Sequence, residues 1–279
     1  MIASAQPRSR TLLPGFGLAL GITLTYLGLI VLIPLSVLLV KAGDAGPPKI
    51  WAELSSPRVL AAFRLSFGMA FLAAVCNAFF GFMLAWVLVR YRFAGRRLMD
   101  AMIDLPFALP TAVAGISLAQ LYANNGWLGS VLAQAGITVA FTPLGVLIAL
   151  IFVGLPFVVR TVQPVLEELD REMEEAAVLL GAARWDIIRR VVIPPLIPAV
   201  MTGATLAFAR AIGEYGSVIF IAGNMPGYSE IVPLLIVIKL EQYDYLGAAV
   251  IASGMLIASF ILLLAINSLQ ARMRRWQGG

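Results

Sequence analysis

Long apolar runs without charge set the strongest limit on what this chain can fold into. Residues 105–159 contain no Asp, Glu, Lys or Arg, and neither do residues 65–89. A helix needs about 20 apolar residues to cross the hydrocarbon core of a bilayer. The shorter run is long enough to cross once, and the longer run is long enough to cross twice. We therefore expect an integral membrane protein.

The composition of the whole chain agrees with this expectation. Of its 279 residues, 61% are hydrophobic and 13% are charged, whereas soluble domains are about 45–50% apolar and about 25% charged. The chain has no histidine, and its one cysteine, Cys76, lies in an apolar run. Histidine-based catalysis and disulfide frameworks are thus excluded, and we expect no metal site.

Hydropathy predicts an all-α membrane protein with six transmembrane helices. They are expected at about residues 17–40, 65–89, 102–122, 138–160, 199–222 and 246–269. The first run is longer than the apolar core of a signal peptide, so we interpret it as a retained helix. The run 231–238 is too short to cross, and we expect a partly buried or interfacial segment on the external side.

Basic residues predict the orientation of these helices. Arginines concentrate in the segments that share a side with the N-terminus, as the positive-inside rule requires of the cytoplasmic side. Both termini are therefore expected in the cytoplasm. The net charge of +5 then reflects topology and contact with membrane lipid, and we do not expect nucleic-acid binding.

One long loop, residues 160–198, separates the fourth and fifth predicted spans. It contains an acidic block followed by alanines and arginines, and two short helices are expected at about 168–180 and 183–191. Gly181 should end the first helix, and the second should end before Pro194. Spacing alone leaves two interpretations, a hairpin lying on its own membrane surface or a docking element for another protein.

The motif within this loop carries a resemblance. Glu175, Ala176, Ala177, Gly181 and Pro194 have the spacing of the EAA motif of ABC importer permeases. The segments 106–115, 156–165 and 213–218 are similar to the sulfate/thiosulfate branch of that family. The resemblance covers about residues 15–271, and it implies the type I ABC importer transmembrane domain fold.

Four regions follow from the spans and the resemblance. We expect a cytoplasmic tail at 1–16, a first transmembrane helix with an external segment at 17–62, and a cytoplasmic tail at 271–279. The ABC transporter transmembrane type-1 domain should occupy 63–270 and hold the coupling loop, 160–198.

The resemblance implies a permease that carries sulfate or thiosulfate across the bacterial cytoplasmic (inner) membrane. The chain lacks a Gly-x-x-x-x-Gly-Lys-Ser/Thr phosphate loop, so we expect no ATPase activity and no bound cofactor in this subunit. ATP and Mg²⁺ would bind to partner subunits. The implied partners are a second homologous (CysW-like) permease, a homodimeric (CysA-like) ATPase and a periplasmic or extracellular sulfate/thiosulfate-binding protein.

The same resemblance assigns residues of the loop to contact with the ATPase. Its docking set is Glu172, Glu175, Ala176, Ala177, Leu180, Gly181, Trp185 and Pro194.

Polar residues inside the predicted spans are candidates for the translocation pathway. Arg210 and Glu214 lie four residues apart, hence on one helix face. Charge within a bilayer is costly and usually functional. The two residues are either a mutually neutralising structural pair, or Arg210 lines the anion pathway while Glu214 orients it or blocks leakage.

Four further candidates lie in the second and third spans. Asp104 precedes Pro106 and Pro110, which either form a kink near a gate or serve packing alone. Asn77 could bind an oxyanion or form a hydrogen bond between helices.

Two other functions remain open at this point. A molybdate or tungstate permease belongs to the same class and is the nearest relative of the sulfate branch. An ion-coupled secondary transporter belongs to another class, in which internal repeats are common. We find no repeat between residues 17–122 and 138–269, and the EAA spacing has no explanation in that class.

Overall fold

The computed structural model of the protein describes residues 16–277 and is all-helical over that range. Most of the expected tail 1–16 and the end of the tail 271–279 lie outside the described residues. The elements are α1 (Phe16–Leu27), η1 (Gly28–Leu32), α2 (Ile33–Gly43), α3 (Gly46–Leu54), α4 (Pro57–Arg90), α5 (Arg96–Ile103), α6 (Leu105–Ala108), α7 (Thr111–Tyr122), α8 (Trp127–Gln134), α9 (Pro143–Glu168), α10 (Arg171–Leu179), α11 (Arg184–Ile187), η2 (Ile188–Val192), α12 (Ile193–Ile212), α13 (Val218–Ile221), α14 (Val232–Glu241) and α15 (Tyr245–Gln277).

Within the described range, five helices are long and apolar enough to cross a membrane. They are Phe16–Gly43, Pro57–Arg90, Pro143–Glu168, Arg184–Ile212 and Tyr245–Arg272, and the shorter apolar helix α7 joins them. The expected class, an all-α membrane protein, is confirmed. The short run 231–238 lies mostly in the ten-residue helix α14, which is too short to cross a membrane, as predicted.

The third predicted span, 102–122, is broken into pieces. Asp104 separates α5 from α6, and the extended residue Leu109 separates α6 from α7. Pro106 occupies the first turn of α6, where a missing N–H has no consequence. Pro110 forces the residue before it out of the helical conformation, so it ends one helix and precedes the next. At these prolines the helix is therefore fully interrupted, which is a larger change than the kink that one interpretation of the sequence predicts.

The predicted ends of the fourth and fifth spans also need correction. Helix α9 continues to Glu168, so the loop between the two spans starts later than residue 160. The helix that starts at Arg184 does not end before Pro194, but passes through the π-helical turn η2 into α12. In this wider turn the Ile193 N–H bonds to the Ile188 carbonyl, which gives the following prolines space without breaking the helix. The fifth span then ends at Ile212 rather than about 222.

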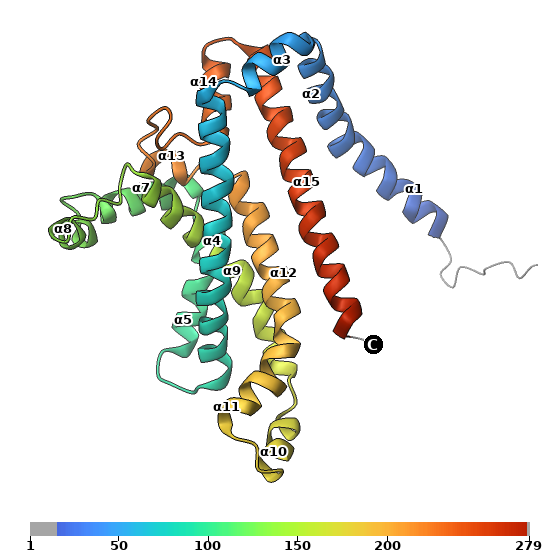
Figure 1. The fold of residues 1–279 in the computed structure, drawn as a ribbon, viewed down its shortest axis with the longest axis vertical. Helices are drawn as coiled ribbons and strands as arrows, with labels where there is room; N and C mark the ends of the chain where they lie inside the picture. Colours follow the sequence, from blue (N-terminus) through green and yellow to red (C-terminus); the bar gives the residue numbers. More distant parts are fainter. Residues whose placement is uncertain (1–15, 278–279) are drawn as a thin grey trace, which may run out of the picture.

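The core consists of α4, α9 and α12, which pack against one another along their lengths (Figure 1). Small residues permit this close approach. A Cβ on Gly81 would lie 2.8 Å from the Val158 side chain, and one on Gly203 would lie 2.7 Å from the Val158 backbone. Helices in membranes associate through such small-residue contacts because lipid provides no hydrophobic driving force, so that close van der Waals packing must hold the helices together.

Helices α1 and α2 lie at the edge of the molecule. The α2 segment packs on α15, whereas α1 leans away from the bundle in Figure 1. No residue of α1 or η1 is buried.

Candidate functional site

A helical hairpin, α10 followed by α11, projects from one end of the bundle (Figure 1). Asp170 begins α10, and its carboxylate accepts a hydrogen bond from the Glu172 N–H at 3.0 Å. Gly181 follows the end of α10 with φ +83°. The N–H groups of Gly181 and Ala182 bond to the carbonyls of Val178 and Ala177, the pairing of a Schellman cap. The expected helix end at Gly181 is confirmed.

The hairpin carries large apolar side chains that the chain itself does not cover. Leu179 and Leu180 are each 88% exposed, and Trp185 is 67% exposed. We call this surface the coupling tip, and it comprises Met173, Val178, Leu179, Leu180 and Trp185. Charged residues beside it place it outside the hydrocarbon core. A clustered apolar surface of this kind marks a site of protein contact.

Most of the predicted docking set lies on the hairpin surface. Glu172, Glu175, Ala176, Leu180, Gly181 and Trp185 are exposed, while Ala177 is half-buried. Ala177 packs against the chain's own cluster around Leu166 and Leu196, and so faces the bundle. Pro194 lies apart from the others, within the first turn of α12. The structure thus brings all but two of these residues to one exposed surface.

An ion pair attaches the hairpin to the end of α4. Arg90 donates to Glu174 at 2.5 Å, and its guanidinium lies 5.4 Å from the ring centre of Trp86. The two charges are separated by 84 residues. On the sequence alone, Arg90 is one of the arginines that indicate the cytoplasmic side, because no local spacing connects it with Glu174.

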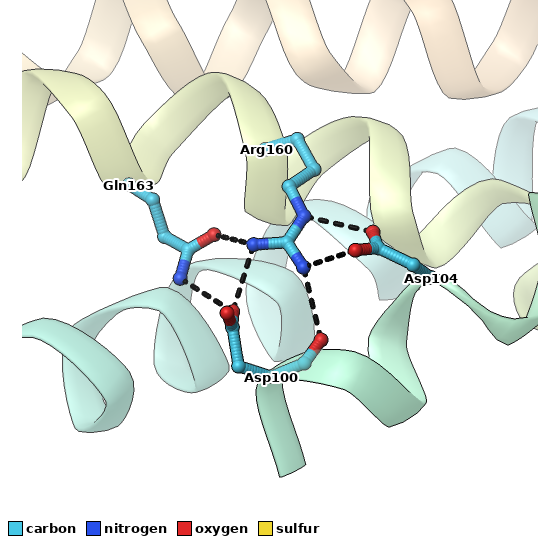
Figure 2. Close-up of polar contacts among 4 residues, drawn as sticks. All are labelled: Asp100, Asp104, Arg160 and Gln163. Atoms are coloured by element: carbon cyan, nitrogen blue, oxygen red, sulfur yellow. Dashed lines mark hydrogen bonds and ion pairs between the residues drawn. The ribbon is translucent and has the colours of Figure 1, made fainter. Parts of the chain in front are cut away.

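A denser cluster forms where α9 meets α5 and α6. Figure 2 shows Arg160 between Asp104, Asp100 and Gln163. Arg160 holds both oxygens of the Asp104 carboxylate, at 2.8 and 2.6 Å. It also donates to the Asp100 carboxylate, the Asp100 carbonyl and the Gln163 amide oxygen. We call these four residues the Arg160 cluster. A cavity of about 430 Å³ lies beside it, lined also by Arg96, Arg97, Pro164 and Glu167.

The cluster favours the ionised form of the Asp100 carboxylate. Burial acts to raise the pKa of Asp100, but the hydrogen bonds from Gln163 and Arg160 outweigh burial and set that pKa below its ordinary value. Of these four residues, only Asp104 is a candidate on the sequence alone. Asp104 forms an ion pair with Arg160, and its role in the translocation pathway stays a prediction.

Arg210 and Glu214 form the expected pair, 2.5 Å apart. Glu214 is 2% exposed, and its second oxygen accepts hydrogen bonds from the N–H and hydroxyl of Ser217, both at 2.9 Å. This carboxylate therefore holds the turn between α12 and α13. The geometry favours the structural interpretation for Glu214, whereas the Arg210 side chain remains 37% exposed.

Asn77 lies at the contact of α4 with α9 and is fully buried. Among the residues that the structure describes, neither polar atom of its amide has a hydrogen-bond partner. A Cβ on Gly154 would lie 2.4 Å from the Asn77 nitrogen. Asn77 is thus placed between helices, without the expected interhelical hydrogen bond.

Ion pairs also join helices at the end opposite the coupling tip. Lys239 contacts Glu53 at 2.6 Å and Asp244 at 2.9 Å. The hydrogen bond from Lys239 and the Gly247 N–H lower the pKa of Asp244. Arg58 binds the buried Glu230 through two hydrogen bonds.

Long membrane-spanning helices, with a protruding hairpin between the third and fourth of them, are the architecture of a permease subunit. The chain belongs to the family of binding-protein-dependent transport system inner membrane components, whose sequence profile matches residues 77–276. The resemblance stated from the EAA spacing is therefore confirmed, and the protein is the permease subunit of an ABC transporter.

The similarity to known proteins extends over nearly the whole chain. The sulfate transport system permease protein CysT of Escherichia coli (strain K12) is 49% identical over 267 residues, which cover 96% of each chain. The CysT protein of Salmonella typhimurium (strain LT2) is 50% identical over the same length and share. A probable CysT of Nephroselmis olivacea is 49% identical over 260 residues, covering 93% of this chain and 92% of the other.

Solved structures confirm the fold. A bacterial ABC transporter that imports alginate matches with a TM-score of 0.74 at 14% identity, covering 92% of this chain and 94% of that one. The methionine ABC transporter MetNI in an inward-facing conformation matches with a TM-score of 0.53 at 20% identity, covering 79% and 98%. These matches establish the ABC importer transmembrane fold.

Proposed function

We propose that this protein is the permease subunit of an ATP-driven sulfate importer. The assignment of sulfate as the substrate rests on the 49–50% identity to sulfate permeases across 96% of the chain. Thiosulfate has the same charge and tetrahedral shape, and the proposal includes it. The proposed site of action is the bacterial inner membrane, with both termini and the coupling tip in the cytoplasm, as the arginine distribution supports.

The energy for transport comes from another protein in this proposal. The chain has no phosphate-binding loop, so ATP and Mg²⁺ belong to a homodimeric ATPase, and this subunit is not itself an enzyme. A second, homologous permease completes the membrane part. A solute-binding protein outside delivers the anion, as in a neighbouring structure where an alginate transporter is in complex with its periplasmic protein.

The coupling tip is the part of the chain suited to contact with the ATPase. Its exposed leucines and tryptophan would fill apolar pockets on the partner, where large buried side chains dominate binding. The Arg90–Glu174 pair and Ala177 hold the hairpin to the bundle. Movement of the ATPase is therefore passed to the helices rather than absorbed by a loose loop.

Substitution of Gly181 tests this docking. Gly181→Asp adds a charge and a strained side chain at φ +83°, and we expect sulfate uptake to fall by about tenfold or more. Gly136→Asp is the matched control, because Gly136 has φ +74° and, like Gly181, open space where a Cβ would lie. Radiolabelled sulfate uptake is measured together with the amount of membrane-inserted subunit. Full sulfate uptake by Gly181→Asp would contradict the proposed docking of the coupling tip on the ATPase.

The anion is tested separately with the purified importer. ATP hydrolysis should rise when a sulfate-loaded binding protein is added to the reconstituted complex. Stimulation only by a molybdate-loaded protein would replace sulfate with molybdate or tungstate and leave the ABC importer assignment intact.

A further inference from the structure

The Arg160 cluster stands between the coupling tip and the broken third span. Arg160 lies about two helical turns before the end of α9 at Glu168. After Glu168 the chain turns at once into α10. The last part of α9 is thus the stem that leads into the hairpin, and movement of the tip acts on this stem directly.

The partners of Arg160 lie on the first pieces of the third span. Asp100 belongs to α5, and Asp104 lies between α5 and α6. An edge-to-face contact of Phe107 with Phe157, with ring centres 5.2 Å apart, adds a second attachment of α6 to α9. Beyond α6 the helix is interrupted at Leu109 and Pro110 before α7 begins.

The bonding within the cluster leaves Arg160 no freedom to shift. All five of its N–H groups are used, two of them in a bidentate pair with Asp104. Gln163, one turn further along α9, also donates to the Asp100 carboxylate at 3.1 Å. Packed apolar side chains can slide past one another, but a bidentate arginine–carboxylate pair fixes both direction and distance.

The helix of the third span is interrupted beyond the cluster, whereas α9 is continuous. Helix α9 runs unbroken from Pro143 to Glu168 although it contains Pro156 and Pro164, and its part around Arg160 packs against α4 and α12. The interruption at Leu109 and Pro110 separates α6 from α7 on the other chain segment. Bending is therefore easier at Leu109 and Pro110 than at the cluster.

Resting on the proposed function, we propose that the Arg160 cluster joins the stem of the coupling hairpin to α5 and α6, so that they move as one rigid body during transport. Asp100, Asp104, Arg160 and Gln163 are positioning residues in this proposal. The body turns against α7 at the interruption Leu109–Pro110. Movement imposed on the coupling tip reaches the third span through the cluster.

Coupling between ATP hydrolysis and transport tests the role of Asp104. In the complete importer reconstituted in vesicles, Asp104→Asn removes the charge and sets an amide N–H group against the guanidinium. We expect assembly and ATP hydrolysis to remain, and the number of ATP molecules used per sulfate to rise about tenfold. Asp104→Glu should restore most of the coupling, because it retains the carboxylate.

The matched control is Asp244→Asn, which also breaks an ion pair but at the opposite end of the molecule. This variant should keep the parent ratio of ATP to sulfate. If Asp104→Asn also kept the parent ratio, or lost assembly and hydrolysis together with uptake, the cluster would be a structural support only and the proposal would be wrong.

A distance measurement tests rigid movement without using the transported anion. Spin labels are placed at Arg97→Cys and Glu167→Cys, on opposite sides of the cavity beside the cluster, with Cys76 replaced by alanine. This distance should be the same with and without ATP, whereas a Gln134–Glu167 pair, which spans the interruption before α7, should change. The first distance should broaden in Asp104→Asn.

Equal changes in both label pairs would contradict the proposal. An error in the substrate would give a different result, since the labels would behave as expected while only uptake of sulfate failed.

Discussion

Buried polar side chains differ in how the protein satisfies them. Glu214 and Glu230 are each 2% exposed, and each has an arginine partner and at least two hydrogen bonds. Asn77 is more deeply buried, and in the described part of the chain its amide has no hydrogen-bond partner. A buried polar group without a partner lowers stability, whereas an apolar group of the same shape does not.

Asn77→Leu should therefore stabilise the subunit. Leucine has nearly the shape of asparagine and brings no polar atoms into the contact with Gly154. We expect a gain of about 1–2 kcal/mol and a rise in Tm of about 2–8 °C, measured by thermal unfolding in detergent. Asn77→Asp should have the opposite effect, because it can place an unpaired charge in the core. A lower Tm for Asn77→Leu would show that the amide has a stabilising partner in the folded protein.

Asp244 predicts a dependence of stability on pH. Its pKa is lowered by Lys239 and by the Gly247 N–H, so its carboxylate favours the folded state. This contribution is fully present above the ordinary aspartate pKa of about 3.9 and is lost as the pH falls through the lower pKa of the folded protein.

The experiment compares the Tm of the parent with that of Asp244→Asn over a series of pH values. The parent should be more stable at pH 7, and the difference should shrink only below about pH 4. A difference that is constant across the acid range would mean that the Asp244 charge does not stabilise the fold.

At the scale of elements, hydropathy predicted most of the spans but not their interruptions. The charge-free run 65–89 became α4, which begins earlier because Ser56 accepts a hydrogen bond from the Val59 N–H and Pro57 starts the helix. Hydropathy placed the third span, but it does not distinguish a kinked helix from a broken one. Pro110 breaks its helix, while Pro194 is accommodated by the π turn before it. The residue type alone cannot predict which outcome the packing allows.

Close packing of α7 on α13 depends on Gly115. A Cβ there would lie 2.3 Å from the Ser217 carbonyl oxygen. Because backbone has to move to relieve this contact, Gly115→Ala should destabilise the subunit by about 1–3 kcal/mol. The measurement is again Tm in detergent.

Gly68→Ala is the control for this substitution. Gly68 lies within α4 with nothing within 4 Å of an added Cβ, and alanine favours helix over glycine. Its Tm should be unchanged or slightly higher. Equal losses from both substitutions would refute the close approach at Gly115.

At the scale of the whole molecule, the sequence could predict the class of protein but not the contacts between residues that lie far apart in the chain. Charge-free runs, arginine distribution and the EAA spacing predicted a membrane permease and its exposed hairpin. The contacts that hold the hairpin and the third span join residues far apart in the chain, such as Arg160 with Asp104, 56 residues away. Such pairs arise from the packing of α5 and α6 on α9, for which no local pattern exists.

The coupling tip has a consequence for the life of the protein in a cell. A subunit that has not yet met its ATPase keeps Leu179, Leu180 and Trp185 in water. Uncovered apolar patches of this kind favour aggregation and attract the proteases that remove unassembled chains. On the proposed assembly, the amount of permease in the membrane is therefore limited by the supply of the protein that covers its tip, and surplus copies are degraded.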